Sequence, residues 1–376
     1  MVEVSSKITQ EIPGGTFFIK QEGLTVLILK GNPSELGQQH GASLKGEIHL
    51  IHSKFSKYLS GLKRGVRGKI LYWILFFLAR RMSRYIPEVL KAEMIAVAKE
   101  AKVPYRFILL LNVLDDLLNT LACSSFAVTG KKAKGGLTIC GRNLDYAIFT
   151  DIMPCLNTVF VYEPKQGYSF ISVAWPGYVG CVTGMNSKGL ALSGHASNTF
   201  DKTRKGIATG ILYRQALQYA TSLKDIEETI ASGPRTIGNN VLVASHDECF
   251  ILELSANRWQ SRPTEGGIIT VTNHYQTSHM LSVQAPFIRK PPGSPLPHNC
   301  FTKDHSAFRD QQLRDLCKKS PLGVDEVIEA LRNEGIANPG TVQSVVFLPA
   351  QKTLWVAQRL EVPVSLGNFV KLEGLL

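Results

Sequence analysis

The sequence predicts an α+β protein in which two antiparallel sheets lie between outer layers of helices. Three observations lead to this prediction. Residues 1–122 have a mostly helical pattern, short strands in hairpins fill most of the chain after residue 123, and two helical blocks interrupt those strands. Since every sheet must cover its apolar faces, this order favours a layered sandwich. We expect two parts, a helical N-terminal segment 1–122 and a strand-rich domain 123–376.

The chain around Cys123 has the pattern of a helix followed by a hairpin. The second strand of that hairpin carries Arg142 and Asp145 back towards the thiol. The expected elements here are a helical run over 113–122 ending in a small residue, strands over 124–129 and 137–145, and a basic turn over 130–136.

Further hairpins and two pairs of helices follow. One helix has a clear start and stop, because Ser222 and Asp225 are spaced as a capping box and Gly233 follows the last turn. The expected strands are 157–163, 168–175, 181–185, 190–194, 240–245, 250–255, 268–272, 342–347 and 354–358, and the other expected helices are 211–221, 304–317 and 324–332.

Composition indicates an ordinary globular protein. The 376 residues contain 44% hydrophobic and 19% charged side chains, enough for a substantial core in one large domain or two. The seven cysteines are odd in number, scattered and without a CxxC pair, which disfavours a disulfide framework and a zinc site. Buried thiols favour a reducing, cytoplasmic setting. Residues 1–15 contain no apolar core typical of a secretory signal.

Much of the formal net charge of +12 lies in one segment, residues 54–84. Its apolar run 70–79 is far shorter than the ~20 residues that a membrane-spanning helix needs. Two interpretations stand equal: a helix lying in an anionic membrane surface, which would make the protein peripheral, or a core helix beside a solvated basic loop. Nucleic acid is not expected as a partner, because no recognisable binding module accompanies the charge. The basic residues are Lys54, Lys57, Lys63, Arg64, Arg67, Lys69, Arg80, Arg81 and Arg84.

The residues of the hairpin suit a nucleophile that the chain frees by cutting itself before Cys123. An ordinary thiol, with a pKa of about 8.5, is mostly protonated at neutral pH, whereas a new α-amino group titrates near pH 8 and can serve as the base. Arg142 can stabilise a thiolate, and Asp145 can orient the ammonium. The alternative is a buried structural cysteine beside a solvated Arg142–Asp145 pair, but the hairpin context favours the nucleophile.

Several segments, in this order along the chain, resemble the N-terminal-nucleophile cysteine hydrolases. The likeness is closest to the isopenicillin-N (acyl-CoA:6-aminopenicillanate) acyltransferase-like branch, and bile salt hydrolases, acid ceramidase and N-acylethanolamine acid amidase look more distant. Two departures are a longer basic turn at 131–136 and Ala122 in place of the glycine often found there. The segments are 27–41, ACSSF at 122–126, GRNLD at 141–145, TNHY at 272–275, SAFR at 306–309 and TVQSVVF at 341–347.

The resemblance implies a four-layer αββα fold and an autoproteolytic cut between Ala122 and Cys123, after which the prosegment 1–122 stays associated with the catalytic domain. It implies Cys123, Arg142, Asp145 and Asn273 as catalytic residues, with the Asn273 amide as an oxyanion donor. No metal or other cofactor is implied. The substrate-binding candidates are Trp175 and Tyr178 in an acyl-pocket loop, His195, His274, and Arg309, which either grips a substrate carboxylate or ties a late helix to the core.

The predicted function is hydrolysis or transfer of acyl groups from small-molecule amides or esters, with lipid-like N-acyl substrates expected. Two alternatives remain open. One is a degenerate scaffold that binds lipid at a membrane surface, and the other is a hydrolase of a different fold that pairs Cys123 with one of the nine histidines.

Overall fold

The structure is a computed structural model of the chain. It describes residues 8–12, 16–21, 23–62, 66–118, 121–286, 290, 294, 296–318 and 321–376. Most of the N-terminal stretch 1–15, as well as Lys63 and Arg64 of the basic segment, lie outside the described residues.

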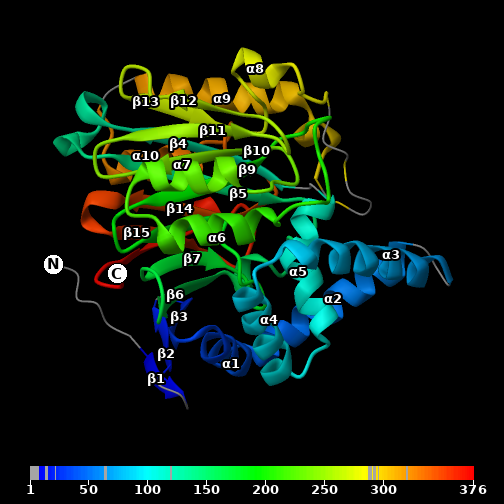
Figure 1. The fold of residues 1–376 in the computed structure, drawn as a ribbon. Coiled ribbons are helices and arrows are strands. Elements are labelled where there is room, and N and C mark those ends of the chain that lie inside the picture. The colour runs from blue at the N-terminus through cyan, green and yellow to red at the C-terminus, as the bar shows by residue number, and fades with distance from the viewer. Residues whose placement is uncertain are drawn as a thin grey trace.

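A larger sheet runs through most of the molecule, and its strands follow nearly their sequence order (Figure 1). Its neighbours are antiparallel except where β3 lies parallel to β6. In spatial order the strands are β1 (Ile8–Ile12), β2 (Thr16–Gln21), β3 (Leu24–Gly31), β6 (Thr158–Pro164), β7 (Phe170–Ala174), β8 (Thr183–Asn186), β9 (Ala191–Ala196), β10 (Asn239–Ala244), β11 (Cys249–Leu254) and β12 (Trp259–Pro263).

A smaller, antiparallel sheet carries the hairpin that contains Cys123. In spatial order its strands are β13 (Ile268–Val271), β4 (Leu121–Val128), β5 (Ile139–Tyr146), β14 (Thr341–Leu348), β15 (Thr353–Gln358) and β16 (Asn368–Leu372).

Helices cover the outer faces of both sheets, and the N-terminal helices gather at one end of the molecule, blue to cyan in Figure 1. These are α1 (Pro33–Ser43), α2 (Lys45–Leu62), α3 (Val66–Met82), α4 (Glu88–Ala101) and α5 (Tyr105–Leu118). The later helices are α6 (Thr209–Tyr219), α7 (Leu223–Ser232), α8 (Ser278–Leu281), α9 (Lys303–Lys318) and α10 (Val324–Arg332).

Three apolar layers separate four layers of secondary structure. In β6, Phe160 and Tyr162 pack under helices, whereas Val159 and Val161 face the smaller sheet. This alternation is what a strand buried on both faces requires. A third apolar layer lies between the smaller sheet and α9 and α10. The four-layer αββα fold expected from the resemblance is therefore confirmed.

Two expectations need correction. The larger sheet is not purely antiparallel, because β3, from the mostly helical segment before Cys123, enters it and pairs in parallel with β6. The helix expected to continue through Ala122 ends at Leu118, and β4 already includes Leu121 and Ala122. These residues pair with the end of β5, and the ladder overrides their helical propensity.

Helix α3, which contains the apolar run 70–79, packs by one face only. Leu75, Ala79 and Met82 are buried on that face. On the outer face Ile70, Trp73, Ile74 and Phe77 are 50%, 56%, 50% and 63% exposed. We call these four residues the α3 stripe. Their spacing of three and four residues places them side by side. A fully buried core helix would cover these side chains, so the exposed stripe favours a surface helix whose other face packs in the core. Among the described residues, no helix is both long and apolar enough to cross a bilayer.

Candidate active site

The β4–β5 hairpin places the cysteine and the arginine on one face of the smaller sheet. Cys123 lies opposite Leu144, and Ser125 lies opposite Arg142. Because side chains alternate along strands, all four point to the same side, towards the interior between the sheets. The hairpin predicted from the sequence thus brings Cys123 and Arg142 together.

The sulfur of Cys123 is fully buried and faces one cation. Arg142 Nη2 lies 3.7 Å from Cys123 Sγ, and Arg142 Nη1 donates to the carbonyl of Gly194 at 2.8 Å. Burial raises the pKa of the Cys123 thiol to about 11, although Arg142 acts in the opposite direction. In the uncut chain the thiol is therefore protonated at neutral pH. Within the described part of the chain, no histidine ring hydrogen-bonds this sulfur, which disfavours a Cys–His hydrolase.

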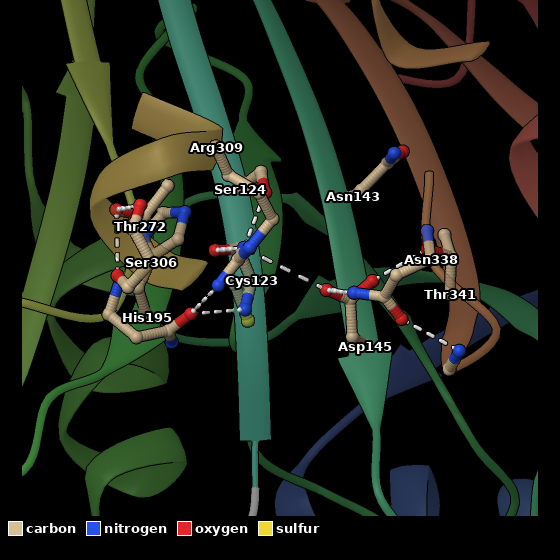
Figure 2. Close-up of polar contacts among 12 residues, drawn as sticks. Cys123, Ser124, Asn143, Asp145, His195, Thr272, Ser306, Arg309, Asn338 and Thr341 are labelled. Carbon is tan, nitrogen blue, oxygen red and sulfur yellow. Dashed lines mark hydrogen bonds and ion pairs between the residues drawn. The ribbon is translucent and has the colours of Figure 1, made fainter. Parts of the chain in front are cut away.

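The backbone of Cys123 is held by an amide and a second arginine (Figure 2). Its N–H donates to Asn273 Oδ1 at 2.9 Å. Arg309 donates to the same oxygen at 2.8 Å and to the carbonyl of Cys123 at 2.6 Å. Asn273 Nδ2 donates to the carbonyl of Ala196 at 2.8 Å. The amide oxygen therefore already faces the nitrogen that a cut would turn into an amine.

Arg309 ties helix α9 to the nucleophile strand. It is buried and also donates to Ser124 Oγ at 2.6 Å. Of the two roles weighed for Arg309, these contacts correspond to the tie between a late helix and the core. The grip on a substrate carboxylate stays a prediction.

Asp145 points to the opposite face of the hairpin from the thiol, the face of Ala122. Its carboxylate accepts hydrogen bonds from Thr341 Oγ1 at 2.7 Å and from Asn338 Nδ2, and Arg309 Nη1 lies 3.9 Å away. Burial raises the pKa of Asp145 to about 6, while Arg309 acts to lower it. Among described residues, no hydrogen bond joins this carboxylate to Cys123 in the uncut chain.

His195 lies beside the site, but both of its ring nitrogens are engaged within the protein. Nε2 is 2.7 Å from Ser125 Oγ, and Nδ1 is 3.1 Å from the carbonyl of Asn240. Burial and the nearby Arg142 hold the pKa of His195 well below its usual range. This neutral, fully buried ring thus hydrogen-bonds the strand that carries Cys123 through Ser125, and its role in binding substrate stays a prediction.

His274 is engaged in a similar way. Its Nδ1 lies 2.9 Å from Ser306 Oγ and 3.1 Å from Thr272 Oγ1, and burial lowers its pKa to about 4. Ser306 Oγ also accepts the backbone N–H of Asn273 at 2.8 Å. His274 therefore belongs to the network that fixes Asn273.

Trp175 and Tyr178 line a narrow cavity of about 50 Å³ together with Tyr146 and residues of α5. The loop that carries them is held from the segment before Cys123. Asn112 donates to the carbonyl of Gly177 at 2.9 Å and accepts the N–H of Val179 at 2.8 Å. The loop expected from the sequence as an acyl-pocket loop thus lines a cavity, and Asn112 of α5 holds that loop.

Sequence reasoning missed the partners of Asp145 and Asn273. Thr341 and Ser306 both lie in motifs that carried the resemblance. Their place in those motifs could have marked them as site residues, although no role was assigned to them. Asn338 gave no signal, because its contact with Asp145 depends on how the chain enters β14. In the described residues, no three His, Cys, Asp or Glu side chains gather as a metal site would require.

Comparison with known proteins agrees with this geometry. The family described as "Acyl-coenzyme A:6-aminopenicillanic acid acyl-transferase" matches residues 128–359, more than half of the chain. The alternative of a degenerate lipid-binding scaffold finds no support in the comparisons.

Individual relatives are distant. The chain is 27% identical over 269 residues to "Acyl-coenzyme A:6-aminopenicillanic-acid-acyltransferase 40 kDa form" of Emericella nidulans, which covers 68% of this chain and 70% of the relative. It is 22% identical over 327 residues to an uncharacterized protein of Archaeoglobus fulgidus, which covers 73% of this chain and 54% of that protein. The match thus spans about half the length of the archaeal relative. Among solved structures, a Caenorhabditis elegans N-acylethanolamine-hydrolyzing acid amidase ortholog is similar with a TM-score of 0.44 and 15% identity, over 60% of this chain and 93% of that one.

Proposed function

Because this chain belongs to the acyl-coenzyme A:6-aminopenicillanic acid acyl-transferase family, we propose that it cuts itself before Cys123 and then cleaves or transfers acyl groups of small-molecule amides. The observation that carries the proposal is the bond from the Cys123 N–H to Asn273 Oδ1. A buried amide thus accepts from the N–H of Cys123, while Arg309 donates both to that amide oxygen and to the carbonyl of Cys123.

Self-cleavage follows from the placement of the thiol and the preceding peptide. Cys123 Sγ attacks the carbonyl carbon of Ala122, the thiol proton passes to the departing nitrogen, and the C–N bond breaks to give a thioester. Water then hydrolyses the thioester and leaves a carboxylate on Ala122 and a free amine on Cys123. Asp145 lies on the face of Ala122 and is positioned to orient the emerging amine.

Turnover reuses the same groups. The free amine takes the thiol proton while Sγ attacks the substrate carbonyl, and Arg142 stabilises the negative charge on sulfur. The amine then gives this proton to the substrate nitrogen as the C–N bond breaks, so that the substrate amine leaves and the acyl group stays on Sγ. Asn273 Oδ1 holds the amine in register. Its Nδ2 has a second N–H besides the one bonded to Ala196, and this proton is available to a developing oxyanion. The acyl-thioester is then passed to water or to an acceptor amine.

The two pieces remain associated after the cut in this proposal. Strand β3 of the first piece lies inside the larger sheet, and Asn112 and His40 of the first piece hold the 175–179 loop of the second. The prosegment thus supplies part of the pocket and is not a removable inhibitor.

Lipid-like substrates and contact with an anionic membrane surface are also part of the proposal. The α3 stripe offers an apolar face, and Arg80, Arg81 and Arg84 are exposed beside it. Each basic residue near an anionic leaflet contributes about 1 kcal/mol. An amphiphilic amide could then pass from the membrane surface to the pocket on α5, against which α3 packs.

Mass spectrometry of the purified protein tests the proposal. We expect two polypeptides, residues 1–122 and 123–376, that co-elute under native conditions, with a free amine on Cys123. Cys123→Ala should stay intact and inactive, and Cys123→Ser should cut slowly and lose most turnover. Cys155→Ala is the matched control, because that cysteine is exposed and lies outside the hairpin. Intact, active protein with Cys123 still in peptide linkage would contradict the mechanism.

A further inference from the structure

The narrow cavity beside the site contains a carboxyl group that the proposed reaction does not use. Its walls are largely apolar and come from both sides of the proposed cut, from Phe55 and Leu114 before it and Trp175 and Val182 after it. Asp115, on α5, lines the same cavity. A carboxyl in an apolar cavity is costly unless it is hydrogen-bonded, so its presence calls for a partner.

The protein provides a hydrogen-bond partner for only one of the two carboxyl oxygens of Asp115. Tyr146 Oη donates to Asp115 Oδ1 at 2.7 Å. Among the described residues, no donor reaches Asp115 Oδ2, and Asp115 is only partly buried. Burial raises the pKa of Asp115 to about 7, against the effect of the Tyr146 hydrogen bond. Asp115 can therefore accept a hydrogen bond at neutral pH in either form and can pair with a cation when ionised.

The neighbouring Asp116 shows what a satisfied carboxylate looks like in this fold. It accepts the N–H of Thr209 at 3.0 Å and the hydroxyl of Thr209 at 2.9 Å, and Thr236 also donates to it. Asp116 thus caps helix α6 and has a structural role. Among the described residues, Asp115 accepts a hydrogen bond from Tyr146 alone, so the two neighbouring acidic residues differ in how fully their carboxyl groups are hydrogen-bonded.

The cavity lies on the same face of the hairpin as the thiol. Tyr146 is two residues beyond Leu144, which pairs with Cys123, and side chains two residues apart share a face. That step corresponds to roughly 7 Å along the strand. An extended acyl chain of about six carbon atoms covers a step of this length, and Tyr146, at the end of the step, is the residue that donates to Asp115.

We propose that Asp115 determines acyl specificity by selecting acyl groups that carry a hydrogen-bond donor, a hydroxyl or an ammonium group, near the far end of a slender apolar chain. This inference rests on the proposed function and deepens it. A plain alkyl chain fills the cavity but leaves Asp115 Oδ2 dehydrated and unpaired, whereas a donor completes its hydrogen bonds. A site with a buried polar group discriminates strongly against an analogue that lacks the matching group.

The volume of the cavity limits how much of an acyl group it can hold. About 50 Å³ is well below the roughly 150 Å³ of a cavity that takes up benzene, so the cavity has room only for the end of an acyl chain.

The test compares amides with one common leaving amine, 7-amino-4-methylcoumarin. The processed wild-type enzyme receives the hexanoyl, 6-hydroxyhexanoyl and 6-aminohexanoyl amides, and kcat/KM is measured for each. We expect the hydroxy and amino substrates to exceed the hexanoyl substrate by about tenfold or more. Asp115→Leu should reverse this preference. Asp115→Asn, which can still bind a hydroxyl, should keep the preference for the hydroxy substrate and lose that for the amino substrate.

Asp247→Asn is the matched control, since it makes the same chemical change in an exposed turn between β10 and β11 and should keep the wild-type preference. Equal kcat/KM for the hexanoyl and hydroxyhexanoyl amides in wild type would overturn the role of Asp115 and leave the proposed function intact. This comparison needs no variant and stands even if an Asp115 variant fails to fold. No turnover of any of the three amides by fully processed enzyme would count against the proposed function and, with it, against this inference.

Discussion

Cys123 combines a buried thiol with a peptide nitrogen that is hydrogen-bonded to Asn273. These two properties distinguish the proposed self-cleavage from the proposed turnover of substrate. In the uncut chain the thiol has a pKa of about 11 and no amine beside it. After the proposed cut, an amine with a pKa near 8 becomes available as a base. In this proposal Cys123 is a poorly activated nucleophile in self-cleavage and a well activated one in every later turnover of substrate.

Asp145 should leave a signature in the pH dependence of self-cleavage. Its pKa in the folded chain, about 6, lies above the ordinary value of 3.8, so its carboxylate form is present above pH 6 and is lost as the pH falls through 6. The cleavage rate should rise with pH because the thiol must lose its proton, and the slope should be steeper below pH 6, where Asp145 must also ionise. Rates measured on freshly refolded precursor between pH 5 and 8 test this.

In Asp145→Asn the rate should be lower, and the change of slope near pH 6 should disappear. Glu326→Gln serves as the control, because it alters an exposed carboxylate at the start of α10. A change of slope that persists in Asp145→Asn would assign that pKa to another group.

The sequence predicted the catalytic candidates better than it predicted their contacts. Cys123 and Arg142 meet because strand pairing, which is readable from the hairpin pattern, fixes their face. Asn273 and Arg309 meet the backbone of Cys123 through contacts between residues more than 140 positions apart, which no local pattern encodes. Arg142 and Asp145 were both expected to point back towards the thiol, but residues 142 and 145 are separated by an odd number of positions, so their side chains lie on opposite faces of the hairpin. The role of Asp145 in orienting the amine stays a prediction.

Among the elements, helix α3 has the most unusual surface. Replacing Ile70, Trp73 and Phe77 with serine should weaken binding to anionic vesicles and raise the apparent KM for long-chain amides. Because these side chains are half exposed or more, the melting temperature should change little and a short amide should be cleaved as before. Co-sedimentation with anionic and neutral vesicles, together with a melting curve, provides the measurement.

Leu75→Ser is the control on the buried face of the same helix, and it should lower the melting temperature. Well-folded wild type that binds neither kind of vesicle would end the membrane hypothesis.

Element prediction succeeded where local chemistry decides. The Ser222–Asp225 capping box and the end of the helix before Gly233 are confirmed. Strand β12 was missed because Trp259–Pro263 is polar, mostly accessible and ends in proline, so its pairing depends on the neighbouring β11. The helix expected over 113–122 ends at Leu118 because Leu121 and Ala122 pair with β5 in the smaller sheet. Both errors occur where pairing between distant strands competes with local secondary-structure propensity.

At the scale of the whole molecule, one buried ion pair links the part before Cys123 to the part after it. Arg214 donates to both carboxylate oxygens of Glu93, at 2.8 and 2.7 Å, and to the carbonyl of Val179 at 2.6 Å. Both side chains are almost completely buried. Removing one partner should cost about 3–5 kcal/mol, because the other charge is left unpaired in the interior.

We therefore expect Glu93→Leu or Arg214→Met to lower the free energy of unfolding strongly, and the double variant to recover part of the loss. Urea unfolding should be measured in the Cys123→Ala background, where the chain stays in one piece. Lys30→Met, which breaks the exposed pair with Glu163, is the control and should change little. Additive losses in the double variant would show that the two residues do not act as a pair.

Because β3 pairs in parallel with β6, the proposed cut would change how the protein can refold after it has unfolded. While the chain is continuous, these strands meet within one polypeptide, at an effective concentration that dilution cannot change. After the cut they belong to separate polypeptides, so recovery from complete unfolding becomes a second-order encounter that dilution slows. The cleaved protein would then retain a fold that it acquired as a precursor and would refold slowly once unfolded. Its lifetime would depend on the rate of unfolding and not on the equilibrium between folded and unfolded forms.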